Sequence, residues 1–375
     1  GLQEGHVSRG RRTSRSRTGV SPVRRLLVGL VSGAAVFVLI VLIALGAALY
    51  LYNGPGPKAA DGASTTTVEL RRGASLPEIA ASLKRAGVIR SPSLFVTAAQ
   101  VSGAARRMKA GEYEFASREP LSKVLEDIRE GRIVKHQVTI PEGLTSEQVV
   151  EILTNEPLLS GDTPAPPEGT VLPETYLFER GEDRAHVLKR MMDAQDQLLS
   201  ILWSHRQPGL PYLTPTEAVT LASIVEKETG KPDERPRVAA VFLNRLKIGM
   251  RLQSDPTVIY GISRGEPLGR GLTAAELSTP TPYNTYAISG LPPGPIANPG
   301  RAALAAVLDP PHTDELYFVA DGTGGHAFAS TLEQHAKNVA RWRQIERQPA
   351  TAKVEVPKAG GGKSGSRSPA RSAGK

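Results

Sequence analysis

The chain has 375 residues, no cysteine and a formal net charge of +9. This length allows about two folded domains, and the lack of cysteine excludes disulfide bonds and thiol chemistry from the sequence. Residues 1–25 carry +6 and residues 349–375 carry +5, which leaves −2 for the body between them. A nearly neutral body does not favour nucleic-acid binding by a folded surface, so we expect no nucleic-acid partner.

The first predicted element is an apolar helix from Leu26 to Leu51 that contains no charged residue. It is long enough to cross a bilayer and longer than the ~7–15-residue core of a signal peptide. Arginines precede it and few charges follow it, which predicts a cytoplasmic tail over residues 1–25 and a periplasmic or outer location for the rest. A cleaved export signal is the alternative. We assign residues 52–64 to a linker.

Two stretches in the first half of the chain resemble each other. Val68–Ala80 aligns with Val138–Val150, and both combine an alternating run, a glycine turn, a Ser or Thr cap and a helical pattern. Each predicts a strand, a turn and a helix, and we assign residues 65–160 to a small subdomain that contains both. Proline-rich Thr163–Pro167 predicts the linker that follows, and the composition of residues 349–375 predicts a disordered basic tail.

The most informative stretch is a helix predicted from about Pro215 to Thr229. Thr214–Glu217 has the pattern of a capping box with proline at the first helical position, and Gly230 supplies a stop. At ~100° per residue, Glu226 lies roughly 80° to one side of an apolar stripe and Glu228 roughly 80° to the other. The stripe consists of Ala218, Leu221, Ala222 and Val225.

Glu226 combines two features that raise a carboxyl pKa, because it lies in the last helical turn and beside the apolar stripe. A raised pKa suits a group that must first give a proton and later take one. Glycosidases need two carboxyls about 5 Å or about 6.5–9.5 Å apart, whereas this helix offers one acid per face. Glu226 and Glu228 therefore cannot act together on one substrate. The alternative is that Glu226 only forms an ion pair on the flank of the helix.

Segments downstream of this helix carry a specific resemblance. They are Val241–Leu246, Gly249–Gly261, Thr281–Tyr286 and Gly290–Ile296. Together with Leu221–Glu228 they closely resemble the endolytic murein transglycosylases of the MltG (YceG-like) family, over a region that reaches about His335. Less specifically, Val68–Ala80 resembles the opening of a LysM module, a small fold that binds N-acetylglucosamine polymers.

The resemblance implies an α+β fold with three parts. A single transmembrane helix is followed by a LysM-like module at 65–160 and by a lysozyme-related catalytic domain at 168–348. The implied activity is cleavage of the MurNAc–GlcNAc bond inside nascent peptidoglycan strands, giving 1,6-anhydro ends. The family further implies a single-pass protein of the inner membrane, with its catalytic domain in the periplasm, that associates with penicillin-binding glycan synthases.

The resemblance also implies roles for particular residues. Glu226 falls on the catalytic acid, and Tyr283 and Asn284 fall on the Tyr-Asn element that lines the cleft. Gln253 is a further candidate for gripping the sugar, and we include Glu228 and Asp255 among the residues of the substrate cleft. Asp255 has an alternative as a turn residue before proline, and each of the polar candidates has an alternative as a turn or helix-end residue. One acid that acts twice needs no metal and no cofactor.

Other functions fit the sequence less well. Gly261–Gly265 matches the pattern of a nucleophile elbow after the strand-like run Val258–Tyr260, but the proline that follows disfavours the helix that an elbow must open. Asp321 and His326 lie too close together to complete a convincing triad. The seven histidines are scattered without a His-Glu-x-x-His motif, and we interpret His326 and His335 as cleft-shaping or core residues. The main alternative is a non-catalytic peptidoglycan-binding scaffold.

Overall fold

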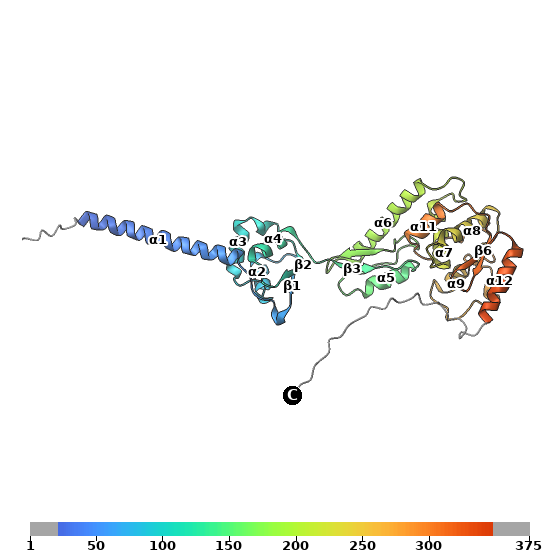
Figure 1. The fold of residues 1–375 in the computed structure, drawn as a ribbon, viewed down its shortest axis with the longest axis horizontal. Coiled ribbons are helices and arrows are strands. Elements are labelled where there is room, and N and C mark those ends of the chain that lie inside the picture. The colour runs from blue at the N-terminus through green and yellow to red at the C-terminus, as the bar shows by residue number, and fades with distance from the viewer. Residues whose placement is uncertain (1–21, 348–375) are drawn as a thin grey trace, which may run out of the picture. The chain divides into compact units, whose positions relative to one another are not determined.

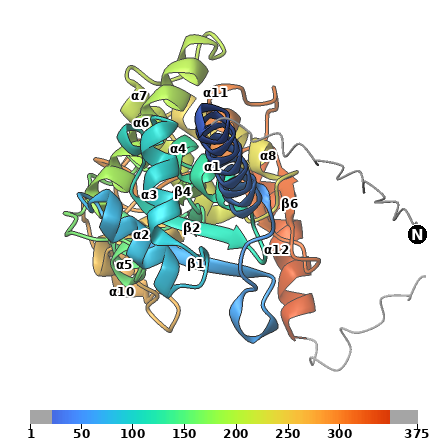
Figure 2. The ribbon, with the colours of Figure 1, turned by 90° about the vertical axis from the view of Figure 1, so that its left-hand side faces the viewer.

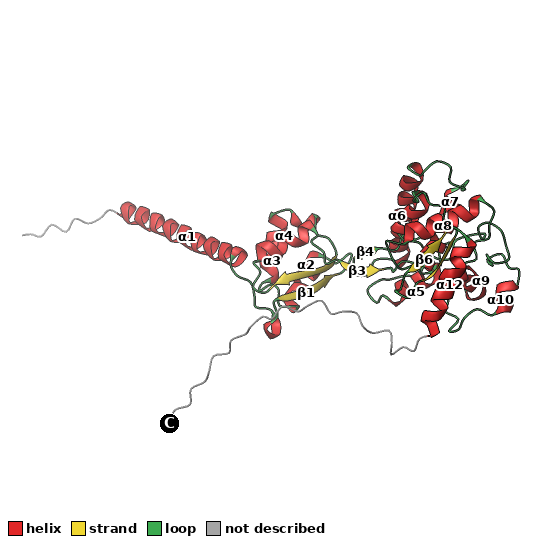
Figure 3. Ribbon diagram, turned by 45° about the vertical axis from the view of Figure 1, so that its right-hand side comes forward, coloured by secondary structure: helices red, strands yellow, loops and turns green. Residues whose placement is uncertain are grey.

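The computed structural model describes residues 22–347, which divide into two compact units. The first unit ends at Val134 and the second begins at Lys135. The C-terminal tail expected over 349–375, and most of the cytoplasmic tail expected over 1–25, lie outside the described residues. Both units combine helices with small antiparallel sheets of two strands, which confirms the predicted α+β class (Figure 3).

The N-terminal helix α1 (Pro22–Asn53) contains the predicted apolar segment. Gly29–Asn53 has a mean hydropathy of 2.8, and none of its most apolar window is buried inside the protein. At ~1.5 Å per residue this stretch is long enough for the ~30 Å hydrocarbon core of a bilayer. This uncovered apolar window is compatible with a membrane anchor, because a bilayer would supply the apolar environment that the protein does not.

The rest of the first unit packs helices against a two-stranded sheet (Figure 2). Its elements are β1 (Thr65–Leu70), α2 (Leu76–Arg85), α3 (Pro92–Val101), the short 3₁₀ helix η2 (Ala104–Arg106), β2 (Gly111–Ala116) and α4 (Leu121–Glu130). A further 3₁₀ turn, η1 (Ala60–Gly62), precedes β1. The strands are antiparallel, with Thr65 opposite Ala116 and Leu70 opposite Gly111. Inward-facing side chains of both strands, including Val68 and Tyr113, join the helices in one core.

The second unit begins with the second of the two similar stretches. β3 (His136–Thr139) leads into α5 (Ser146–Asn155), and β3 pairs with β4 (Thr175–Phe178), which precedes α6 (Arg184–Ser204). The expected boundary near residues 160–168 is therefore misplaced, because strand pairing and a shared core tie both sides of it together. The core comprises Val138, Ile140, Val149, Leu153, Leu159, Val171, Phe178, Val187, Leu188 and Met191.

Both similar stretches form the predicted strand, turn and helix. Gly73 and Gly143 each have φ near +77°, a left-handed conformation that suits glycine. Ser75 and Thr145 each form a capping box at the start of the following helix. The two stretches therefore share the same local structure. Val68–Ala80 lies in the first unit and Val138–Val150 in the second.

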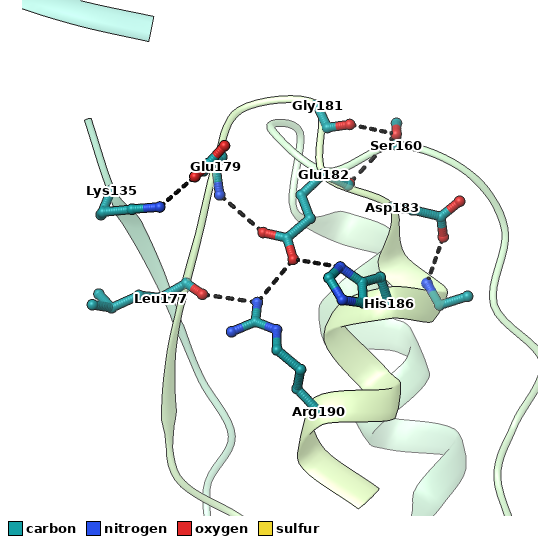
Figure 4. Close-up of polar contacts among 10 residues, drawn as sticks. Lys135, Ser160, Leu177, Glu179, Gly181, Glu182, Asp183, His186 and Arg190 are labelled. Atoms are coloured by element: carbon teal, nitrogen blue, oxygen red, sulfur yellow. Dashed lines mark hydrogen bonds and ion pairs between the residues drawn. The ribbon is translucent and has the colours of Figure 1, made fainter. Parts of the chain in front are cut away.

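Glu182 ties the start of α6 to β4 (Figure 4). Its Oε1 lies 3.0 Å from Arg190 Nη2 and 3.0 Å from His186 Nδ1, and its Oε2 accepts the backbone N–H of Glu179 at 3.1 Å. Arg190 also donates to the carbonyl of Leu177 in β4, at 2.9 Å. One carboxylate therefore fixes the turn between strand and helix.

The remaining elements of the second unit include three helices that form its main core. They are α7 (Pro215–Glu228), α8 (Arg235–Lys247), α9 (Asp255–Ser263), α10 (Ala274–Ser278), α11 (Arg301–Leu308), β5 (Tyr317–Ala320), β6 (His326–Ala329) and α12 (Leu332–Arg347). α7, α8 and α11 pack against one another, and β5 and β6 form an antiparallel pair (Figure 1). The strand-like reading of Val258–Tyr260 is wrong, because these residues lie inside α9. Asp255 and Pro256 open that helix, and proline is favoured there.

Arg184 should stabilise the fold by capping α5. Its guanidinium donates to the carbonyls of Leu153 (2.6 Å), Thr154 (3.2 Å) and Glu156 (3.0 Å), which end the helix. We expect Arg184→Met to lower the free energy of unfolding by about 1–3 kcal/mol, measured by urea denaturation. Lys189→Met, which removes an exposed ion pair with Asp193 on the same helix, should cost less than about 1 kcal/mol. Equal losses in the two variants would contradict the capping role.

Candidate active site

The helix α7 is buried on more of its surface than the single predicted apolar stripe. Thr214 and Glu217 form the predicted capping box, with Pro215 in the first turn, and the helix ends at Glu228, one residue before the expected end. Every residue from 218 to 225 is buried, so the helix is covered on nearly all sides. The Ser223 hydroxyl accepts the backbone N–H of Ile296 at 3.0 Å, which seats the 290–296 loop on α7. This packing gives the carboxyl-terminal turn a fixed position.

Glu226 lies in that turn with its side chain only 5% exposed. Its Oε2 accepts the backbone N–H of Gly300 at 2.9 Å, and its Oε1 lies 3.2 Å from Arg235 Nη2. Gly300 is the residue that caps the amino end of α11, where N–H groups point outward. Burial raises the pKa of Glu226, while the hydrogen bond from Gly300 and the charge of Arg235 partly oppose that rise.

A second carboxylate, which the sequence analysis did not select, lies beside Glu226. Glu142 Oε2 is 3.8 Å from the same Arg235 Nη2, and its charge contributes to the raised pKa of Glu226. A β-carbon added to Gly300 would come within 1.9 Å of Glu142 Oε1, so the side chain lies directly against that glycine. One signal was available in the sequence. The second repeat has Pro141-Glu142 where the first has Arg71-Arg72.

Glu228 occupies a different environment, as the helical angles predicted. Its carboxyl accepts the hydroxyl of Ser254 rather than contacting the Glu226 site. Burial raises the pKa of Glu228 to about 7, and the nearby charge of Asp255 adds to the rise, while His326 and Arg245 oppose it. Near neutral pH this group is therefore partly protonated, and it binds the loop that leads into α9.

The loop before α9 presents two of the predicted site residues. Gln253 is exposed and has φ of 54°, and its backbone N–H donates to the carbonyl of Thr285. Asp255, a candidate for the substrate cleft with an alternative as a turn residue, is the first residue of α9 and accepts the hydroxyl of Tyr286 at 2.7 Å. The loop therefore fixes the backbone of Gln253 but leaves its side chain in solvent.

Tyr283 and Asn284 differ sharply in what they can contact. The ring of Tyr283 packs on Tyr260 with 5.0 Å between centroids, and the residue is only half-buried. Asn284 is fully buried, with its Nδ2 directed at the carbonyls of Glu276, Leu277 and Thr279. Its Oδ1 accepts the N–H of Tyr286. The expected direct contact between Asn284 and a sugar finds no support in this geometry, because the amide is consumed in shaping its own loop.

The serine-hydrolase alternative conflicts with the structure. Ser263 ends α9 and donates to the carbonyls of Ile259 and Glu266, so it is not at a strand-to-helix elbow. Asp321 instead binds Thr323, and His326 Nδ1 lies 2.8 Å from Glu234 Oε2. Within residues 22–347, no three His, Asp or Glu side chains gather in a way that could hold a metal ion. Burial raises the pKa of both Glu226 and Glu228, and Glu226 is the one of the two that accepts from Arg235 and Gly300.

Known proteins place these residues in context. The sequence profile of the YceG-like family matches residues 68–341. A relative from Bacillus subtilis (strain 168), named endolytic murein transglycosylase, is 30% identical over 329 residues, which cover 79% of this chain and 90% of the relative. A relative of the same name from Streptococcus pneumoniae (strain ATCC BAA-255 / R6) is 29% identical over 340 residues, covering 78% of this chain and 61% of the relative.

A solved structure is also similar. The crystal structure of a YceG-like protein from Listeria monocytogenes has 29% sequence identity and a TM-score of 0.46, and the match covers 73% of this chain and 98% of that one. The profile match spans both similar stretches, α7 and the Tyr283 loop. The chain therefore belongs to the YceG-like family.

Proposed function

We propose that this protein is a membrane-anchored endolytic transglycosylase of peptidoglycan and that Glu226 is its catalytic acid and base. The observation that carries the proposal is a buried carboxyl with a raised pKa, held at both oxygens, at the end of α7. The names of the relatives from Bacillus subtilis and Streptococcus pneumoniae support the substrate and the reaction.

The contacts of Glu226 suit both halves of the reaction. In the first half its proton passes to the glycosidic oxygen of a MurNAc–GlcNAc bond, which breaks as the sugar gains oxocarbenium character. The resulting carboxylate is stabilised by the Gly300 N–H and by Arg235. In the second half the carboxylate takes the proton of the muramyl 6-hydroxyl, whose oxygen closes onto the anomeric carbon. The product is a 1,6-anhydro end, and no water is consumed.

Roles for the other predicted residues follow from their exposure. The exposed side chain of Gln253 and the half-buried ring of Tyr283 are the groups we assign to substrate contact, together with Asp255 at the start of α9. Glu228 and Asn284 support the site from within, since their polar atoms bind the loops that carry these residues. They act through loop position rather than through the sugar.

The first unit suits a role in holding glycan near the membrane. Its βααβ order and two-stranded sheet support a LysM-like module. A cavity lies between the turn after β1 and the segment before β2, and its lining includes Gly73, Ala74, Met108 and Lys109. With α1 as a single inner-membrane anchor and the catalytic unit in the periplasm, the enzyme would cut nascent strands made by penicillin-binding synthases and so end their elongation.

Replacing the acid should abolish turnover without unfolding the protein. Glu226→Gln keeps the shape but removes the proton donor, so we expect a loss of ~10²–10⁴-fold or more in kcat. Release of muropeptides from purified sacculi, followed by mass spectrometry, measures this. Glu228→Gln is the matched control from the same helical turn and should retain far more activity. Comparable activity of Glu226→Gln and wild type would remove Glu226 from the mechanism.

Product chemistry distinguishes transglycosylation from hydrolysis. Products should be lighter by one water than hydrolytic products, and digestion in H₂¹⁸O should leave no heavy oxygen at the new ends. This result is expected because the sugar's own hydroxyl is the acceptor. Heavy oxygen in a reducing-end muramic acid would show hydrolysis instead, and the carboxylates of Asp255 and Glu142 would then be tested as the group that activates water.

Glu228 should make the stability depend on pH. Its usual pKa is 4.5 and its folded pKa is about 7, so both states hold the proton below about pH 4.5. Between these values only the folded chain keeps it, and stability falls as pH rises. We expect the Tm of Glu228→Gln, relative to wild type, to increase from pH 4.5 to 7 and then level off. A constant difference in Tm across this range would contradict the raised pKa.

A further inference from the structure

The turn of the second repeat is fastened over the carboxyl-terminal end of α7. Lys227 Nζ donates to the carbonyl of Gly143 at 3.1 Å, and the N–H of Gly143 donates to the carbonyl of Asn298 at 3.0 Å. A β-carbon on Gly143 would lie 3.5 Å from Glu226 Cγ. The turn is therefore part of the wall of the Glu226 site, and it carries Glu142 with it.

Arg235 lies between two carboxylates of unequal exposure. Its guanidinium is 3.2 Å from Glu226 Oε1 and 3.8 Å from Glu142 Oε2. The Arg235 side chain is 8% exposed, whereas that of Glu142 is 44% exposed. Arg235 Nε is buried and has no hydrogen-bond partner among the described residues. The guanidinium is therefore fixed by charge more than by a complete set of hydrogen bonds.

We propose that Glu142 is a positioning residue for the reaction, which shares the Arg235 guanidinium with Glu226 and so allows Glu226 to carry a proton. The proposal rests on the proposed function of Glu226. Without Glu142, a protonated Glu226 would leave a buried arginine with no counter-charge, a state that is strongly disfavoured. That arrangement would favour ionised Glu226, which is a poor acid. With Glu142 present, the protonated state of the three groups has no net charge.

The charged and polar groups facing Glu226 come from four elements. Arg235 lies on α8, Glu142 on the β3–α5 turn, Lys227 on α7 itself, and the Gly300 N–H at the start of α11. Burial and Glu142 raise the pKa of Glu226, and the other three groups lower it. Removing the charge of Glu142 must therefore lower the pKa at which the acid loses its proton.

The test is the pH profile of kcat/KM for Glu142→Gln, measured as muropeptide release from sacculi. A general acid fails when it ionises, so the alkaline limb should move to lower pH. We expect a loss of about tenfold on the alkaline side and a smaller loss on the acid side. Glu142→Asp keeps the charge on a side chain that is one methylene shorter. The alkaline limb of its pH profile should therefore lie between those of wild type and Glu142→Gln.

The matched control is Glu174→Gln. Glu174 is 46% exposed and pairs with Arg301 at 3.3 Å, so the variant also removes an exposed carboxylate from an ion pair in the same unit. Its profile should coincide with that of wild type. The proposal would be overturned if the alkaline limb of the kcat/KM profile of Glu142→Gln lay at the same pH as that of wild type, whether or not the rate fell uniformly. Glu142 would then have a structural role. If Glu142→Gln does not fold, an unmoved limb in Glu142→Asp overturns it. Wild type that releases no product from sacculi would instead refute the proposed function itself.

Discussion

Burial of one carboxyl group at the end of α7 is the constraint around which the second unit is arranged. An isolated charge in such a position would be costly. The carboxyl of Glu226 is stabilised by the backbone N–H of Gly300 and by the guanidinium of Arg235. These partners come from α11 and α8, which pack on α7. The core formed by the three helices therefore does more than stabilise the unit, because it fixes the distance between Glu226 and the groups that tune its proton affinity.

The two similar stretches show how one local structure can serve two purposes. Strand, glycine turn and capped helix recur because the same short-range rules act on both sequences. Their turns differ in charge, with two arginines at Arg71 and Arg72 in the first and Pro141 and Glu142 in the second. In the second copy the turn contacts Lys227 and Asn298, which makes it part of the wall of the candidate active site. Local sequence determines the strand, turn and helix of each stretch, and tertiary packing determines which residues the turn contacts.

Short-range signals account for the parts of the fold that the sequence predicted well. The capping box at Thr214, the proline after it and the apolar periodicity gave α7 within one residue at its end. The opposite environments of Glu226 and Glu228 follow from helical geometry alone. The helix α1 was equally easy to predict, because its apolar run is the one stretch within residues 22–347 that is long and apolar enough to cross a membrane.

Long-range contacts account for what sequence reasoning missed. Arg235 and Gly300 lie nine and 74 positions from Glu226, and no periodicity links them to it. The domain boundary was misplaced because β3 pairs with a strand beyond the proline-rich loop, a contact that composition cannot reveal. Val258–Tyr260 looked like a strand because β-branched and aromatic residues favour one, whereas Asp255-Pro256 started a helix there instead.

Gly300 shows how closely these distant pieces constrain one another. Its φ of −75° is open to any residue, so backbone strain does not explain a glycine here. The explanation is space, since a β-carbon would overlap the carboxyl of Glu142 while the backbone N–H of the same residue donates to Glu226. A side chain at this position would have to displace the Glu142 carboxyl. The absence of a β-carbon at one residue thus lets two acids approach the same arginine, and the proposed role of Glu142 depends on this arrangement.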